Sequence, residues 1–348
     1  SVGMPLRPGT MKWVAAELAR AGVASLRFDT RFLPASGGSL IREEDLRLEH
    51  LAGDVVAWVR HMRADRRFSR SVLAGHSEGG LVALLATRDV GVDGLVLLAT
   101  PGRPLGDVLR EQLAGKLPAD LKPEAERILA ALERGQTAAD VPPALLPLYR
   151  PSVQPYLISS LRLNPSDMLR RARVSVMLVQ GDADLQVSMA DFDRLKTARP
   201  DALALKVSGM NHVLKQASGD LAAQSESYRS PDWPLAPGWV PKMAGFVKGR
   251  GLPERRDGAA HIEACTRQQA PLPDHHHPAG HRQGQQQRRQ KQGDGVAVGE
   301  KIVQVHGRGR GGKGSAQVQH IEHVEQAALL VCQKTHRPQA PLRVGGTA

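Results

Sequence analysis

The 348-residue sequence predicts an α/β fold with a mostly parallel sheet, and three observations support this. First, short apolar runs with strand character alternate with stretches that repeat apolar residues at helical spacing, which is the pattern of βαβ units. Second, a serine between glycines lies directly between one such strand and the next helix. Third, the composition changes sharply near Arg250, so we expect one α/β domain over residues 1–250 and a separate tail.

The elements follow one another in the order that this fold requires. Apolar periodicity, with glycine as a stop signal after the first helix, distinguishes helices from strands. Between 104 and 173 the chain is rich in leucine, alanine and proline and poor in strand signals, which predicts a helical insert. The other predicted elements are a helix at 11–21, a strand at 23–28, a helix at 46–62, a strand at 72–74, a helix at 81–85, and strands at 95–99, 174–179 and 202–207.

The segment 75–80, Gly-His-Ser-Glu-Gly-Gly, is the most informative part of the chain. A serine in a sharp turn between a strand and a helix is held in a cramped backbone conformation with its hydroxyl exposed. Gly75 and Gly79 let the strand and helix pass closely enough, so they are predicted to be structural. Ser77 is therefore the candidate nucleophile. The alternative is a glycine-rich loop that holds a phosphate or no ligand.

A carboxylate and a histidine follow later strands. Asp184 comes shortly after the strand at 174–179, and His212 lies in the loop after the strand at 202–207. A serine hydroxyl needs an imidazole to take its proton, and the imidazole needs a carboxylate to fix its tautomer. Asp184 is preferred as the acid over Asp182, whose position also fits ordinary turn chemistry. The alternative for His212 is an ordinary surface-loop histidine.

These motifs together resemble bacterial α/β-hydrolase-fold serine esterases, a group that also holds serine-aminopeptidase-like relatives. The resemblance covers about residues 1–250, and the order Ser77, Asp184, His212 is that of this fold. It implies a carboxylic ester hydrolase that works through an acyl-enzyme without metal or organic cofactor. It also implies that the backbone N–H of Glu78 is one donor of the oxyanion hole.

The same resemblance gives the insert at 104–173 the role of a cap over the serine. Its leucines and tyrosines are candidates to line an acyl pocket, although packing in the cap's own core is favoured for any single one of them. The candidates are Leu145, Leu146, Leu148, Tyr149, Tyr156 and Leu157. The family also has strands before the first helix, whose last loop supplies a second oxyanion donor, and we expect this sequence to lack those N-terminal strands.

The tail, residues 251–348, is predicted to be a low-complexity, disordered segment. Its apolar islands at 296–305 and 324–332 are each too short to build a core. One alternative is a permuted fold in which the island at 296–305 replaces a missing strand. With 14 basic and 8 acidic residues and no interleaved aromatic residues, the tail gives only weak support for binding a polyanion such as nucleic acid.

Composition narrows the remaining possibilities. Cys265 and Cys332 lack the paired spacing of a zinc site, so no metal is expected. The sequence has no apolar run of about 20 residues, so no membrane span is expected. The expected compartment is the cytoplasm, with secretion or the periplasm as the alternative because the start of the sequence looks truncated.

The sequence thus predicts a serine hydrolase that cleaves small carboxylic esters with short acyl groups. Alternatives are a peptidase or thioesterase of the same fold, or a non-catalytic module whose basic tail binds polyanions.

Overall fold

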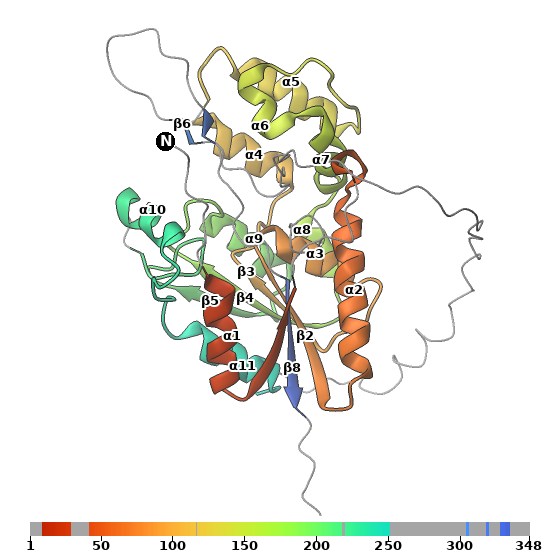
Figure 1. Cartoon of the computed structure of the whole chain (residues 1–348), viewed down its shortest axis with the longest axis vertical. Helices are drawn as coiled ribbons and strands as arrows, with labels where there is room; N and C mark the ends of the chain where they lie inside the picture. The colour runs from red at the N-terminus through yellow and green to blue at the C-terminus, as the bar shows by residue number, and fades with distance from the viewer. Residues whose placement is uncertain are drawn as a thin grey trace, which may run out of the picture. The chain divides into compact units, whose positions relative to one another are not determined.

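A six-stranded sheet forms the centre of the molecule (Figure 1). The computed structural model describes residues 9–28, 42–115, 117–217, 220–250, 304–305, 318–319 and 328–334. The strands of the large sheet are β1 (Val23–Arg27), β2 (Phe68–His76), β3 (Gly94–Leu98), β4 (Ser175–Gly181), β5 (Leu203–Val207) and β8 (Ala328–Lys334). Their order across the sheet is β1-β8-β2-β3-β4-β5, and β2 to β5 pair in parallel.

Helices cover both faces of this sheet. The α-helices are α1 (Thr10–Arg20), α2 (Leu48–Ala64), α3 (Glu78–Ala86), α4 (Leu105–Ala114), α5 (Lys122–Glu133), α6 (Leu146–Tyr149), α7 (Gln154–Leu161), α8 (Pro165–Arg171), α9 (Met189–Ala198), α10 (Leu221–Arg229) and α11 (Trp239–Val247). Short 3₁₀ helices are η2 (Glu43–Asp45), η3 (Pro143–Leu145) and η4 (Pro151–Val153). The predicted α/β architecture, with a mostly parallel sheet flanked by helices, is confirmed.

The two faces follow from the alternation of side chains along a strand. On β3, Leu95 and Leu97 are buried in the core beneath α2 and α3. Gly94 points to the opposite face, where a Cβ atom on it would lie 3.0 Å from the ring of Phe246 in α11. α1 packs beside α11. The sheet is therefore buried on both sides, which explains why its strands read as continuous apolar runs.

Helices α4 to α7, here called the cap, group beyond one end of the sheet (Figure 1), whereas α8 packs beside α3 and α9. α4, α5, α6 and α7 share a hydrophobic cluster separate from the core of the sheet. Four of the predicted acyl-pocket residues are buried in this cluster, namely Leu145, Leu148, Tyr149 and Leu157. Leu146 is exposed, and Tyr156 packs in the core of the sheet instead.

The position of β8 corrects the prediction for the tail. Residues 328–334 were expected to lie in a disordered segment, but they form a strand that pairs antiparallel with both β1 and β2. Leu330, Val331 and Cys332 are buried there. The physical reason is that a run of five apolar residues suffices for a central strand when both neighbours already exist.

The permuted-fold alternative assigned the added strand to the wrong apolar segment, residues 296–305. Of residues 296–305, only Gln304–Val305 (β6) are described as a strand, and they pair with Val318–Gln319 (β7) in a separate two-stranded sheet. The strand added to the large sheet comes from the island at 324–332. The remaining residues of the predicted tail lie outside the described part of the chain, as do residues 1–8.

Candidate active site

Ser77 lies at the turn from β2 into α3. Its φ of 53° and ψ of −126° place it in a conformation that non-glycine residues rarely adopt. The turn is held by its N–H, which donates to Leu98 O at 2.8 Å, and by its carbonyl, which accepts from Gly80 N at 3.0 Å. A Cβ atom on Gly75 would lie 2.2 Å from Gly79 O, so strand and helix cross at a distance that only glycine permits.

The backbone N–H of Glu78 is at the start of α3, directly after Ser77. A helix N-terminus directs N–H groups and the positive end of the helix dipole towards the space before it. This is the location expected of the predicted oxyanion donor. The second donor was expected from the segment before α1, and residues 1–8 of that segment lie outside the described part of the chain.

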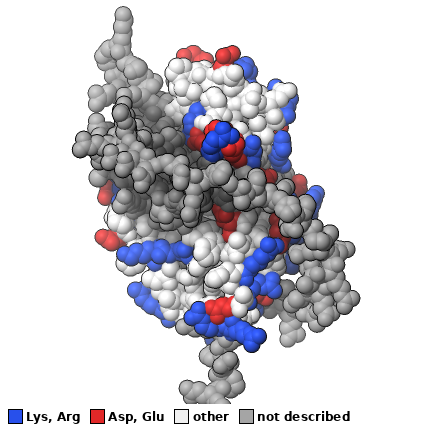
Figure 2. Space-filling model, turned by 45° about the vertical axis from the view of Figure 1, so that its right-hand side comes forward, with Lys and Arg blue, Asp and Glu red and all other residues white. Residues whose placement is uncertain are grey.

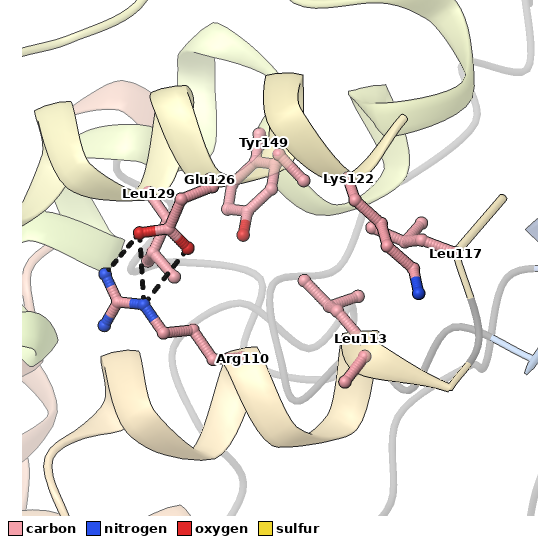
Figure 3. A pocket seen from close by; sticks show the side chains of 9 residues that line it. Arg110, Leu113, Leu117, Lys122, Glu126, Leu129 and Tyr149 are labelled. Atoms are coloured by element: carbon pink, nitrogen blue, oxygen red, sulfur yellow. Dashed lines mark hydrogen bonds and ion pairs between the residues drawn. The ribbon is translucent and has the colours of Figure 1, made fainter. Parts of the chain in front are cut away.

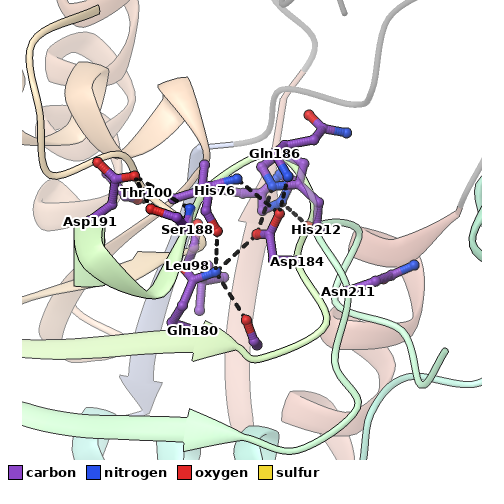
Figure 4. Close-up of polar contacts among 12 residues, drawn as sticks. His76, Leu98, Thr100, Gln180, Asp184, Gln186, Ser188, Asp191, Asn211 and His212 are labelled. Carbon is purple, nitrogen blue, oxygen red and sulfur yellow. Dashed lines mark hydrogen bonds and ion pairs between the residues drawn. The ribbon is translucent and has the colours of Figure 1, made fainter. Parts of the chain in front are cut away.

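Asp184 follows β4 in a tight loop and accepts four hydrogen bonds. Its Oδ1 accepts from the backbone N–H groups of Gln186 at 2.8 Å and Val187 at 3.0 Å. Its Oδ2 accepts from Gln180 Nε2 at 3.0 Å and lies 2.9 Å from His212 Nδ1 (Figure 4). The carboxylate is therefore fixed in one orientation and directed at the imidazole.

His212 follows β5, in a loop with a network of buried polar contacts. Asn211 Nδ2 donates to Ser227 Oγ at 2.7 Å, and Asn211 Oδ1 accepts from Lys215 N at 3.0 Å. Lys215, which is also buried, donates from Nζ to the carbonyls of Ser227 and Ser230. The side chains of His212 and Asp184 both have 0% exposure. The loop thus presents His212 on a rigid backbone.

The structure brings Asp184, rather than Asp182, to His212. Asp182 is exposed, and its Oδ1 accepts from Gly209 N at 2.6 Å. This bond joins the loop after β4 to the loop after β5, just before His212. Asp182 therefore stabilises the loop, which is the role that ordinary turn chemistry gives it.

A contact that the sequence did not predict joins the serine turn to the histidine loop. His76 Nε2 donates to His212 O at 2.7 Å, and the two imidazole rings lie 5.0 Å apart between centroids (Figure 4). Because Ser77 is the next residue after His76, this contact ties the turn that bears Ser77 to the loop that bears His212. The only signal in the sequence was the histidine immediately before the serine.

Asp191 anchors the segment that leads from β3 into the cap. Its buried carboxylate accepts from the N–H groups of Gly102 and Arg103, each at 3.1 Å, and pairs with the Arg103 guanidinium at 2.8 Å. Burial alone would raise the pKa of Asp191, but the hydrogen bonds and charge of Arg103 outweigh it and hold this pKa below its usual value. Ser188 Oγ donates to the same carboxylate at 3.0 Å.

The cap also contacts the loop of the candidate acid. Gln112 Nε2, on α4, donates to Gln186 O at 3.2 Å. Gln186 in turn donates from Nε2 to the hydroxyl of Tyr228 on α10 at 2.7 Å. The loop after β4 is thus held from the cap on one side and from α10 on the other.

Three further observations concern metal sites, membrane spans and surface charge. Within the described ranges, no group of three or more His, Cys, Asp or Glu side chains is arranged to hold a metal ion. No helix in the described part of the chain is both long and apolar enough to cross a membrane. On the face in Figure 2, basic and acidic side chains are interspersed.

Comparison with known proteins points to esterases. No protein-family model matches the chain. It is 24% identical over 212 residues to Esterase EstD of Thermotoga maritima, a match that covers 60% of this chain and 50% of that protein. The chain therefore spans about half the length of this curated relative.

Solved structures that match include the esterase domain of a Rhodothermus marinus protein and an esterase from a Rhodococcus species. The first is 20% identical with a TM-score of 0.39, and the match covers 64% of this chain and 78% of that one. The second is 21% identical with a TM-score of 0.33, covering 60% and 74%. The chain is thus similar in sequence to a bacterial esterase, and its sheet has the mixed, mostly parallel α/β arrangement described above.

Proposed function

We propose that the chain hydrolyses carboxylic esters through an acyl-enzyme on Ser77, with His212 as general base and acid and Asp184 as the group that orients His212. The observation that carries the proposal is the 2.9 Å contact between His212 Nδ1 and Asp184 Oδ2, both fully buried. It lies beside the strained turn that bears Ser77. The similarity to EstD supports the same reaction.

The chemistry follows from which imidazole nitrogen holds the proton. A carboxylate oxygen accepts, so Nδ1 of His212 donates to Asp184, and Nε2 is left to accept the proton of Ser77 Oγ. Ser77 Oγ then bonds to the ester carbonyl carbon, and the negative charge on the carbonyl oxygen is stabilised by the Glu78 N–H. The tetrahedral intermediate expels the alcohol, which takes the proton from His212.

The second half of the reaction repeats these roles with water. His212 Nε2 takes a proton from a water molecule, whose oxygen attacks the acyl carbon. The C–O bond to Ser77 breaks, Ser77 Oγ regains its proton from His212, and the carboxylic acid leaves. No metal or organic cofactor is needed in either half of this proposed cycle.

The proposed preference for short acyl groups rests on the cap. Leu145, Leu148 and Leu157 are buried in the cap's own hydrophobic cluster. These three leucines are not among the described residues that line the cavity within the cap. We therefore propose that acetyl to butyryl esters are turned over faster than long-chain esters.

The proposal is tested with a graded series of nitrophenyl acyl esters and matched thioesters and anilides, using the full chain. Ser77→Ala is expected to lower kcat by about 10⁵-fold or to background. Ser69→Ala, an exposed serine on the same strand, is the matched control and is expected to retain activity. Ester hydrolysis that survives Ser77→Ala would contradict the proposal, and faster turnover of thioesters or anilides would reassign the substrate class.

A further inference from the structure

A cavity of about 280 Å³ lies inside the cap, between α4, α5 and α6. Most of its lining is apolar, from Leu113, Ala114, Leu117, Ala125 and Leu129. Arg110, Lys122, Glu126 and Tyr149 complete it (Figure 3). Neither Ser77 nor Asp184 nor His212 is among these described lining residues, so the cavity is separate from the candidate active site. An apolar cavity with a few polar groups is the usual form of a small-molecule site.

The hydroxyl of Tyr149 is the polar group inside this cavity. The Tyr149 side chain is fully buried, and its hydroxyl has no hydrogen-bond partner among the residues that the structure describes. Figure 3 shows the hydroxyl pointing into the space between α4 and α5. Burial raises the pKa of Tyr149 above its usual value, so the phenol keeps its proton and can donate it. A ligand with an acceptor oxygen would satisfy this buried donor, which is costly to leave unpaired.

Positive charge is available at one end of the cavity only. Arg110 is already neutralised, since its guanidinium pairs with Glu126 at 2.8 Å and Glu133 at 2.7 Å. Lys122 is exposed, and the described residues offer its ammonium group no ion pair or hydrogen bond. Lys122 also begins α5, so the positive end of that helix dipole lies at the same end.

We propose that this cavity binds a small monocarboxylate with an unbranched apolar tail. The carboxylate accepts a hydrogen bond from the Tyr149 hydroxyl, the exposed Lys122 ammonium supplies a longer-range attraction for its charge, and the tail packs against Leu113, Leu117 and Leu129. The Glu126 carboxylate, which also lines the cavity, disfavours a second negative charge and so excludes dicarboxylates. The site is independent of the proposed esterase reaction because it uses none of the residues proposed for it.

The experiment is calorimetric titration of the full chain with sodium octanoate, and with octan-1-ol and octylammonium as chemical controls. We expect saturable octanoate binding with a dissociation constant on the order of 1 mM, as suits a ligand of this size. Octanol is expected to bind more weakly and octylammonium not at all. Tyr149→Phe, which removes only the hydroxyl, is expected to weaken octanoate binding about tenfold.

Lys122→Gln is expected to weaken octanoate binding by about two- to fivefold at low salt, and less at high salt. Lys242→Gln, the same change at an exposed lysine on α11, is the matched control and is expected to leave binding unchanged. Ala114→Trp, at an exposed position of the lining, is expected to abolish binding by filling the entrance. Circular dichroism of each variant checks its fold.

Two results would overturn the proposal. One is the absence of saturable octanoate binding to the unmodified chain. The other is octanoate binding that is unchanged by both Tyr149→Phe and Ala114→Trp, which would place the bound acid elsewhere, for example at the candidate active site.

Discussion

Gln180 donates its side-chain amide to Asp184 Oδ2 at 3.0 Å, the same oxygen that lies 2.9 Å from His212 Nδ1. The amide of Gln180 also reaches Val187 O at 3.1 Å, so one buried side chain near the end of β4 fixes both the acid and the far end of its loop. Gln180 is therefore a positioning residue for the proposed triad.

We expect Gln180→Met to lower the kcat of Ser77-dependent ester hydrolysis by about 10- to 100-fold, because a small displacement of a positioned catalytic group is costly. Methionine keeps the length and most of the volume of glutamine but lacks its donors. Because Gln180 is remote from the proposed substrate carbonyl, KM is expected to change little. A variant that folds and retains full kcat would show that Asp184 is held adequately by its two backbone donors.

The two aspartates after β4 allow a matched comparison. Asp184→Asn is expected to lower kcat/KM by up to about 10⁴-fold, since an amide can hold the imidazole in the wrong tautomer, as in the serine proteases. Asp182→Asn is expected to keep most activity because the asparagine oxygen can still accept from Gly209 N. Steady-state kinetics of both variants on one ester checks this. Equal losses, or a larger loss for Asp182→Asn, would assign the acid differently.

Gly75 and Gly53 should respond to alanine in opposite directions. At Gly75 the added methyl would lie 2.2 Å from Gly79 O, and we expect Gly75→Ala to lower the free energy of unfolding by about 3 kcal/mol or more. At Gly53, inside α2, nothing lies within 4 Å of the added Cβ. Gly53→Ala is expected to raise the free energy of unfolding by about 0.5–1 kcal/mol. Urea unfolding measures both, and a tolerated Gly75→Ala would contradict the close crossing of β2 and α3.

The placement of β8 predicts the effect of two truncations. Deleting residues 328–348 removes a strand from between β1 and β2 and leaves both with unpaired edges in the middle of the sheet. We expect this chain to aggregate or to lose its cooperative thermal transition. Deleting residues 335–348 spares β8. The midpoint of the thermal transition is then expected to stay within a few degrees of that of the full chain. If both truncated chains melt like the full chain, β8 contributes nothing to the fold.

Cys332 gives a chemical test of the same strand. Burial raises the pKa of Cys332 to about 11 and excludes reagents from the thiol. In a Cys265→Ser background, an aromatic disulfide reagent is expected to modify Cys332 at pH 8 only as fast as the chain unfolds, and rapidly in urea. Fast modification of the native protein would show that β8 is not buried.

The same raised pKa sets a dependence of stability on pH. The thiol keeps its proton in the folded chain up to about pH 11, whereas the unfolded thiol releases it near its ordinary pKa of about 8.5. The stabilisation from the protonated thiol is complete below the unfolded pKa and is lost as the pH rises from there through the folded pKa. Cys332→Ala should reduce this alkaline loss, which is measured by urea unfolding across this pH range.

Much of the fold was readable because its signals are local. The helix at 11–21 is found as Thr10–Arg20, and the strand at 202–207 as Leu203–Val207, because apolar periodicity and glycine punctuation act within a few residues. The strand at 72–74 extends further, as Phe68–His76, since its polar start carries no apolar signal. α9, α10 and α11 were not predicted at all.

The sequence by itself determined the α/β class and the order in which Ser77, Asp184 and His212 follow three strands. These features depend on residue type and on spacing along the chain, which can be read from the sequence alone. Only the tertiary structure decided which aspartate meets His212, that His76 joins the two loops, and that residues 328–334 enter the sheet between β1 and β2. Those outcomes arise from contacts between segments far apart in the chain, where packing and hydrogen-bond geometry, rather than local preference, select the partner.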